Sequence, residues 1–215
     1  MVRLYGMSVV GLPDPMEHPE MMKDFSLERK EKIKRFKQPE SRRQSLGAGL
    51  LLNHVLHSHG FHMDDVTYAV HGKPQIDGFH FNMSHSGDYI ICAVSENSVG
   101  CDVEKVSDLP QNIAERYFTS KEVAYLNQLG DAEKVNEFYR IWTMKESYLK
   151  MTGEGLQFGM NRCAFRIGTV VEVYQDDEKQ DCHMKEYRLN GYKVTVCAKE
   201  DIFNENIEFI NIMEK

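Results

Sequence analysis

The chain has few cysteines, no long apolar run, no excess of positive charge and no linker rich in proline and glycine. Its 215 residues include five cysteines, and no two of them form a C-x-x-C pair. Such cysteine usage predicts neither a disulfide framework nor a zinc site and is typical of reducing compartments. The apolar stretches are far shorter than the roughly 20 residues of a membrane span, and the one at the N-terminus is too short for a signal peptide. We therefore expect a cytoplasmic protein with no membrane segment.

The balance of charge makes a nucleic-acid-binding protein an unlikely class. The chain carries 26 Lys and Arg against 33 Asp and Glu, a formal net charge of −7. Proteins that bind nucleic acids usually carry an excess of basic side chains, because these displace counterions from the phosphates. The charge is uneven, however, since residues 23–43 carry a net charge of +5. This basic segment indicates either a confined anionic ligand or a solvated helix face, and the sequence alone leaves both open.

The order of the expected elements favours an α+β fold built of two halves. Helices are expected over residues 26–36, 39–59 and 131–152, and a capping box over residues 119–122 opens a further short helix. Strands are expected over residues 3–10, 66–70, 80–83, 89–95, 99–104, 163–174, 183–189, 192–199 and 206–212. A chain of this length fits one large domain or two small ones. We predict an N-terminal half over residues 1–104 and a C-terminal half over residues 105–215, each a small, mostly antiparallel sheet packed with helices.

Two acidic residues share one face of the strand expected over residues 99–104. Because strand side chains alternate, Asp102 and Glu104 point to the same side, while Cys101 and Val103 point into the core. Neighbouring carboxylates repel each other unless a cation lies between them. Oxygen ligands suit Mg²⁺, which usually keeps water and phosphate in its shell, and these ligand types admit Mn²⁺ as well. The pattern alone is equally compatible with an exposed strand edge that carries two acids.

The helix expected over residues 131–152 contributes a further acid and a base. Phe138, Trp142 and Leu149 form an apolar stripe, and Glu146 and Lys150 lie beside it, one turn apart. The two side chains can serve as a third metal ligand or general base and as a phosphate partner, or simply form a surface salt bridge. Taken with the two acids of the strand, they suggest Mg²⁺-assisted chemistry at a phosphate or pyrophosphate.

These two segments resemble the signature pair of the 4′-phosphopantetheinyl transferase superfamily. The pattern G-[ILV]-D-[ILV]-E corresponds to Gly100–Glu104, with Cys101 as a departure, and [FW]-[STC]-x-K-E-[AS]-x-x-K corresponds to Trp142–Lys150. Residues 72–74 and Asn82–Gly87 resemble the family's coenzyme A-binding loops. Length and motif spread are similar to the surfactin-synthetase-activating type, which implies a monomer of two pseudo-symmetric halves with the active site at their interface.

The resemblance implies transfer of 4′-phosphopantetheine from coenzyme A to a serine of an apo acyl or peptidyl carrier protein, with release of adenosine 3′,5′-bisphosphate. Asp102, Glu104 and Glu146 would hold Mg²⁺ against the pyrophosphate. Glu146, directly or through a metal-bound water, would take the serine proton, and the family leaves open which of the two is the base. Lys150 would stabilise or protonate the leaving phosphate.

The resemblance also implies a set of contacts to coenzyme A. Ser84 and His85 would contact the 3′-phosphate or the ribose, residues Gly72, Lys73 and Pro74 the adenine, Lys145 a second phosphate, and Arg43 the 3′-phosphate. Arg29 and Lys32 would lie near the same 3′-phosphate. The basic segment would then be part of a phosphate site.

Two other functions use the same residues. One is a Mg²⁺-dependent phosphohydrolase, which would release phosphate without a carrier protein. The other is a non-catalytic homologue that only binds carrier proteins, which is disfavoured because all three acids and Lys150 are present. The sequence does not identify the carrier proteins, and by resemblance we expect them to dock at residues 105–118 and after Gly153.

Overall fold

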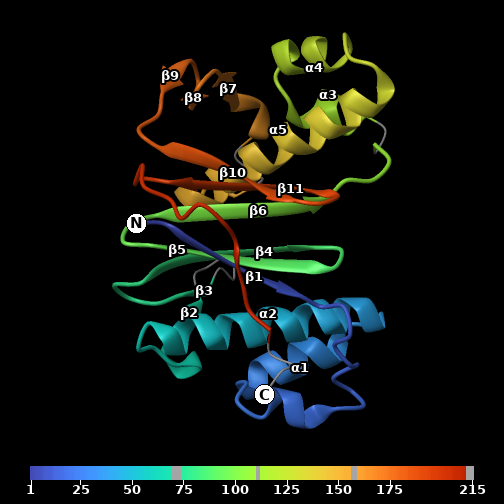
Figure 1. Ribbon diagram of the computed structural model, residues 1–215, viewed down its shortest axis with the longest axis vertical. Coiled ribbons are helices and arrows are strands. Elements are labelled where there is room, and N and C mark those ends of the chain that lie inside the picture. The colour runs from blue at the N-terminus through green and yellow to red at the C-terminus, as the bar shows by residue number, and fades with distance from the viewer. Residues whose placement is uncertain (69–73, 110–111, 156–158, 212–215) are drawn as a thin grey trace.

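The computed structural model describes residues 1–68, 74–109, 112–155 and 159–211 as a stack of helices and sheets (Figure 1). From the bottom of that view, helices α1 (Leu27–Arg35) and α2 (Pro39–Ser58) lie under a first sheet. A second sheet follows above it, then helix α5 (Asp131–Thr152). At the top lie helices α3 (Ile113–Tyr117) and α4 (Ser120–Leu126) beside a small third sheet.

The first sheet has the strand order β12-β1-β5-β4. Its strands are β1 (Arg3–Ser8), β4 (His80–Ser86), β5 (Tyr89–Ser95) and β12 (Glu208–Phe209). Strands β1, β5 and β4 pair antiparallel, and β12 joins the edge of β1 in parallel. Apolar residues of α2 pack against one face of this sheet, among them Leu51, Leu52 and Val55, each at most 1% exposed. The opposite face, which carries Leu4 and Ile91, is therefore the one left to pack against the second sheet.

The second sheet has the order β10-β11-β6 and lies between the first sheet and α5. Its strands are β6 (Val99–Lys105), β10 (His183–Leu189) and β11 (Tyr192–Ala198), all antiparallel. One core cluster fills the space between the two sheets and includes Leu4 and Ile91 of the first sheet with Val103 and Val196 of the second. The two sheets are thus joined by a shared apolar core.

Side chains of β4 bind the backbone of β6 at the junction of the sheets. Because β6 is the last strand of its sheet, one of its edges has no strand partner in that ladder. The Cys101 N–H donates to Asn82 Oδ1 at 3.0 Å, and the Lys105 N–H donates to Ser86 Oγ at 3.1 Å. These bonds fix β6 against β4 and so place the two strands that carry the predicted site side by side.

Helix α5 lies directly on β6 because position 100 is a glycine. A Cβ atom there would lie 2.1 Å from the Ser147 carbonyl oxygen and 2.4 Å from the Met151 nitrogen. No other residue type permits an approach this close, since both neighbouring atoms belong to the backbone. The helix ends at Gly153, whose φ of 79° is in the left-handed region that favours glycine.

The remaining elements are short. They are the 3₁₀ turns η1 (Pro19–Met22), η2 (Met63–Asp65) and η4 (Met160–Arg162), the two-stranded sheet of β2 (Thr67–Tyr68) and β3 (Pro74–Gln75), and the third sheet of β7 (Cys163–Ile167), β8 (Val171–Gln175) and β9 (Glu178–Lys179). The strand predicted over residues 163–174 is wrong as one element, because β7 and β8 form an antiparallel hairpin around Gly168. Part of the strand predicted over residues 66–70 lies outside the described residues.

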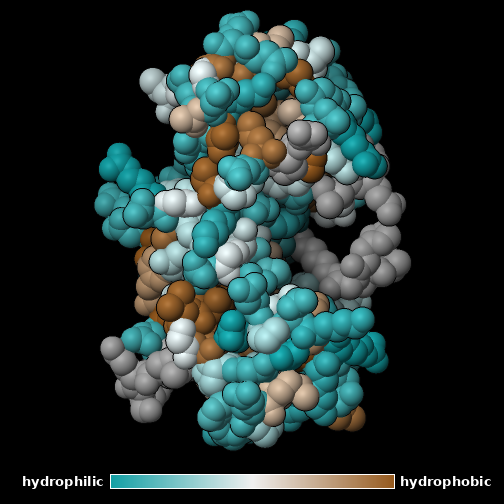
Figure 2. Space-filling view, turned by 90° about the vertical axis from the view of Figure 1, so that its right-hand side faces the viewer, coloured by the Kyte–Doolittle hydropathy of each residue, from teal (hydrophilic) through white to brown (hydrophobic). Residues whose placement is uncertain are grey.

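The predicted α+β class with small, mostly antiparallel sheets and packed helices is confirmed. The pseudo-symmetry of two halves and the boundary at residue 104 stay predictions. The sheets do not follow that boundary strictly, since β6 pairs with β11 and β12 pairs with β1. Among the described residues, no helix is both long and apolar enough to span a membrane. The face shown in Figure 2 is mainly hydrophilic, with hydrophobic side chains in separate patches.

Candidate active site

Asp102 of β6 and Lys150 of α5 form a buried ion pair where α5 crosses the strand. Lys150 Nζ lies 2.6 Å from Asp102 Oδ1 and also donates to the Cys101 carbonyl at 3.3 Å. Ser84 of β4 donates to the same Oδ1 at 2.7 Å and accepts from Lys150 Nζ at 3.1 Å. Three elements therefore meet at one carboxylate that is only 2% exposed.

Burial and charge act against each other in this pair. Burial raises the pKa of Asp102, while Lys150 and Ser84 lower it by binding the carboxylate. Burial lowers the pKa of Lys150, but the attractions of Asp102, Cys101 and Glu146 together outweigh it, so the pKa of Lys150 lies above its ordinary value. The lysine is thus held as a cation beside the acids.

The other two acids add negative charge to the same place. Ser86 Oγ donates to Glu104 Oε2 at 2.8 Å, and burial together with the charge of Asp102 raises the pKa of Glu104. Glu146 is 9% exposed, and burial, with further contributions from Asp102 and Glu104, raises its pKa to about 7. Lys150 opposes that shift in Glu146. A carboxylate with a pKa near 7 is suited to general-base work at neutral pH.

The residues fit a divalent cation, although they do not form a closed cage. In the described ranges, no group of three or more His, Cys, Asp or Glu side chains is arranged as a metal site. Asp102 Oδ2, however, is buried and finds no hydrogen-bond partner among the described atoms. An orphaned carboxylate oxygen beside two acids with raised pKa values is what an added cation would satisfy. An open set of acids suits Mg²⁺, because that ion usually keeps water and phosphate ligands.

His85 lies on the other face of β4 from Ser84. Alternation along the strand directs Ser84 and Ser86 to β6 and His85 away from it, onto an exposed position. Desolvation and the charges of Lys150 and Lys32 lower the pKa of His85, and Asp102 acts in the opposite direction. His85 is therefore electrostatically coupled both to the Asp102 pair and to the basic segment.

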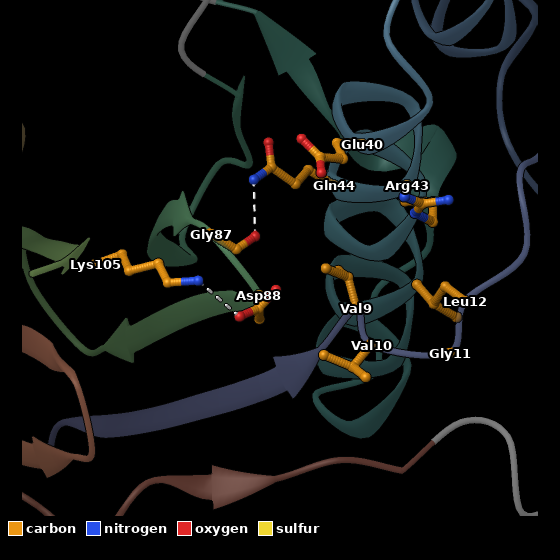
Figure 3. Close-up of a pocket in the computed structure, with 10 residues that line it drawn as sticks. All are labelled: Val9, Val10, Gly11, Leu12, Glu40, Arg43, Gln44, Gly87, Asp88 and Lys105. Atoms are coloured by element: carbon orange, nitrogen blue, oxygen red, sulfur yellow. Dashed lines mark hydrogen bonds and ion pairs between the residues drawn. The ribbon is translucent and has the colours of Figure 1, made fainter. Parts of the chain in front are cut away.

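Arg43 lines a separate cavity of about 530 Å³ at the ends of β1, β4 and β6 (Figure 3). Gln44 Nε2 donates to the Gly87 carbonyl at 2.8 Å, and Lys105 Nζ pairs with Asp88 Oδ2 at 3.2 Å on the opposite side. Neither Asp102 nor Lys150 lines this cavity. The cavity adjoins the site residues only in sequence: its lining residue Lys105 follows Glu104, and its lining residue Gly87 follows Ser86.

The predicted adenine contacts are only partly described. Gly72 and Lys73 lie outside the described residues. Pro74 lines a cavity of about 550 Å³ that also includes Met151, Thr152 and Gly153 at the end of α5. Three residues that line this cavity therefore follow Lys150 directly in the sequence.

The side chain of Lys145 does not lie with those of the other predicted site residues. Its side chain is fully buried and pairs with Glu122 Oε2 at 2.9 Å. It also donates to the carbonyl oxygens of Met160, at 2.9 Å, and Cys163. These partners occupy its donors on the side of α4 and η4, so the geometry does not support the expected phosphate contact of Lys145. This placement agrees with the position of Lys145 about 100° around α5 from Glu146, and the phosphate contact itself stays a prediction.

The contacts of Arg29 also differ from the expected position near a phosphate. Its guanidinium donates to the Ser45 carbonyl at 3.1 Å and lies 5.5 Å from the centre of the Phe25 ring. These contacts hold α1 against α2. Lys32, by contrast, remains close enough to His85 to lower its pKa.

Four residues have roles in the site that the sequence did not indicate. Asn82 and Ser86 bind β6, Glu122 binds Lys145, and Gly100 admits α5. Gly100, Asn82 and Ser86 lie in segments that resemble family motifs, but the motifs did not reveal these contacts. The contacts join elements that are far apart in the chain.

Known proteins share the sequence features that carry this site. The family model of the 4′-phosphopantetheinyl transferase superfamily matches residues 98–197, which include β6 and α5. The chain is 31% identical over 223 residues to 4′-phosphopantetheinyl transferase Sfp of Bacillus subtilis (strain 168), and the match covers 99% of both chains. It is 30% identical over 201 residues to the transferase psf-1 of Bacillus pumilus, covering 89% of this chain and 86% of the relative.

A solved structure, the holo-[acyl-carrier-protein] synthase of Thermotoga maritima, aligns with a TM-score of 0.39 and 21% identity over 46% of this chain and 61% of that one. This likeness is too low to add to the description of the fold. The Bacillus relatives, in contrast, extend over nearly the whole sequence and confirm the resemblance indicated by the two motifs. The chain belongs to the 4′-phosphopantetheinyl transferase superfamily, in the group of the surfactin-synthetase-activating type.

Proposed function

We propose that this chain transfers the 4′-phosphopantetheine group of coenzyme A to a serine of an apo acyl or peptidyl carrier protein. The observation that carries the proposal is the buried meeting of Asp102, Ser84 and Lys150, which joins the two sequence motifs at one point. The curated relatives that match nearly the whole chain are named 4′-phosphopantetheinyl transferases. Neither a phosphohydrolase nor a non-catalytic homologue has comparable support.

In the proposed reaction, the serine hydroxyl loses its proton to Glu146, directly or through a water molecule beside it. The serine oxygen forms a bond to the phosphorus that carries pantetheine. The bond from that phosphorus to the oxygen shared with the adenosine-side phosphate breaks, and adenosine 3′,5′-bisphosphate leaves. Lys150, held protonated beside Asp102, stabilises the charge on the leaving phosphate.

Asp102, Glu104 and Glu146 would hold Mg²⁺ or Mn²⁺, which when bound would neutralise charge on the pyrophosphate. The support is the unsatisfied Asp102 Oδ2 and the raised pKa values of Glu104 and Glu146. Ser84 orients Asp102 and Lys150 in this arrangement, and the small part of Ser84 that stays exposed, 8%, would contact coenzyme A.

The rest of coenzyme A would extend along the face of β4 that carries His85. His85, with Lys32 near it, would bind the 3′-phosphate, and Gly72, Lys73 and Pro74 the adenine. Arg43 would add a positive charge from the neighbouring cavity. Carrier docking is assigned to the C-terminal half, residues 105–215.

We further propose a monomer in the cytoplasm that binds neither nucleic acid nor membrane. All five cysteines are buried and none is joined in a disulfide, which is the usage expected in a reducing compartment. The net charge of −7 disfavours binding to polyanions.

The test is a mass measurement on apo carrier proteins from peptide synthetases, polyketide synthases and fatty-acid synthases. Incubation with the chain, coenzyme A and Mg²⁺ is expected to add one phosphopantetheine group to the carrier serine, and Asp102→Ala is expected to abolish the addition. Unchanged carrier masses across the panel, with wild type and Asp102→Ala alike, would reject the transferase. Release of phosphate without a carrier would instead indicate the phosphohydrolase.

A further inference from the structure

Among the described residues, Lys145 has three hydrogen-bond partners although it is fully buried. Its Nζ pairs with Glu122 Oε2 at 2.9 Å and donates to the Met160 carbonyl at 2.9 Å and to the Cys163 carbonyl. An ammonium group has three hydrogens, so each of them has an acceptor. A buried charge is tolerated only when it is paired and hydrogen-bonded in this way.

Aromatic rings enclose the same ammonium group. The rings of Phe118, just before α4, and Phe165, on β7, each have their centre 5.5 Å from Lys145 Nζ. At this distance the faces of the rings attract a cation. The Lys145–Glu122 pair is therefore part of the packed core between α5, α4 and β7.

Glu122 fixes the start of α4 at the same time. The Thr119 N–H donates to Glu122 Oε2 at 2.8 Å, and the Glu122 N–H donates to Thr119 Oγ1 at 3.2 Å, which forms a capping box. One carboxylate oxygen thus binds both the N-cap of α4 and Lys145 of α5. Through its two carbonyl partners, Lys145 also ties α5 to η4 and to the start of β7.

Helix α5 is consequently held on two sides of its axis by anchors that are five residues apart. Lys150 binds Asp102 and Ser84 toward β6, and Lys145 binds Glu122 toward α4. Glu146 directly follows Lys145, so a rotation of α5 that broke the Glu122 bond would also turn Glu146. The distance between these two anchors is less than two helical turns.

We propose that Lys145 is a positioning residue, which through Glu122 fixes the rotation of α5 and so directs Glu146 toward Asp102 and Glu104. The inference rests on the proposed function, because Glu146 is there a metal ligand and base. It assigns Lys145 no contact with coenzyme A. It also gives a role to a lysine in a position where an apolar side chain would fill the space.

The test compares Lys145→Met with Lys121→Met, a matched control on the exposed side of α4. Mn²⁺ is titrated against the full chain with saturating coenzyme A and followed by electron paramagnetic resonance. Lys145→Met is expected to bind Mn²⁺ about tenfold more weakly, the order of loss seen when groups behind metal ligands are removed. Its kcat is expected to fall while its KM for coenzyme A stays near the wild-type value. Lys121→Met is expected to behave as wild type in both measurements.

A second variant separates positioning from stability. Lys145→Met leaves Glu122 buried without its cation and lowers the melting temperature, whereas Lys145→Met with Glu122→Leu removes both charges and is expected to recover most of it. The inference holds if this double variant melts near wild type yet still binds Mn²⁺ weakly. It is overturned if the double variant, or Glu122→Gln, is folded and has wild-type Mn²⁺ affinity and kcat.

Failure of the inference is distinguishable from failure of the proposed function. If wild type and Asp102→Ala bind Mn²⁺ equally and neither modifies a carrier, the metal site itself is wrong. If they differ as expected while the Lys145 variants match wild type, only the positioning role is wrong.

Discussion

Lys150 and Lys145 show how neighbouring residues of one type take different roles on a helix. They are five positions apart on α5, and each pairs with a buried carboxylate, but on different sides of the helix. Lys150 keeps part of its side chain exposed, 28%, where a phosphate can reach it, while the side chain of Lys145 is 0% exposed. Exposure, rather than charge or motif position, decides which lysine can meet a substrate.

Glu146 gives a prediction for the metal-free chain. Its pKa is about 7 in the fold against 4.5 for the ordinary group, so between these values the folded state binds more protons than the unfolded state. The free energy of unfolding must therefore fall as the pH rises through this window, by about 2 to 3 kcal/mol in total. The measurement is urea unfolding in EDTA at pH 5 and at pH 8.

The matched variant is Glu146→Gln, which has no such proton to lose. We expect its stability to change less between the two pH values, with a remaining slope from Glu104, whose pKa is also raised. Equal slopes for the variant and wild type would show that Glu146 is not the group with the raised pKa.

At the scale of elements, the packing of α5 on β6 depends on Gly100. Because a Cβ at this position would meet backbone atoms of Ser147 and Met151, the helix must move as a whole to admit it. Overpacking of this kind typically costs about 1–3 kcal/mol or more. Gly100→Ala is expected to lose at least that much stability in urea unfolding and most of its transfer activity, because Lys150 moves away from Asp102.

The control for this prediction is Gly130→Ala, since a Cβ at Gly130 meets nothing within 4 Å. This variant is expected to keep wild-type stability and activity within a few tenths of a kcal/mol. A Gly100→Ala protein with wild-type stability would contradict the close packing of α5 on β6.

The long, strongly patterned elements were predictable from the sequence, and the pairings between distant segments were not. Helices α1, α2 and α5 begin and end within a few residues of their expected bounds, because proline, capping residues and glycine mark their termini. The β7–β8 hairpin was missed, since its turn is marked by little more than Gly168 within an otherwise strand-like run. No local pattern indicates that β6 pairs with β11, about 90 residues later.

The same division applies to the site. Asp102, Glu146 and Lys150 were predictable because they lie in two short motifs, and the structure brings Asp102 and Lys150 into contact. Lys145 belongs to the same motif, yet its partner Glu122 follows only from how α4 packs on α5. Asn82 lies in a segment that resembles a coenzyme A-binding loop, yet its bond to Cys101 exists only because β4 lies beside β6.

At the scale of the whole molecule, the two predicted halves are interlocked. Strand β6, at the end of residues 1–104, pairs with β11 of the C-terminal segment. Strand β12, near the C-terminus, returns to β1, where Glu208 binds Arg3 through two hydrogen bonds of 3.0 and 2.7 Å. Each half therefore supplies a strand to the sheet of the other, and one core cluster contains residues from both.

This exchange of strands leads to a prediction about the fragments 1–104 and 105–215. The first would expose β6 without β11, and the second would lack β6 and leave β12 without β1, so neither can close its sheet or cover its core. We expect each fragment alone to give poorly dispersed amide NMR spectra, and the intact chain to unfold in one transition. Mixing the fragments is expected to restore dispersion and part of the transfer activity, because the missing strands are then supplied in trans. Well-dispersed spectra from either fragment alone would show that the halves are independent domains, and the shared core would then be an interface between them.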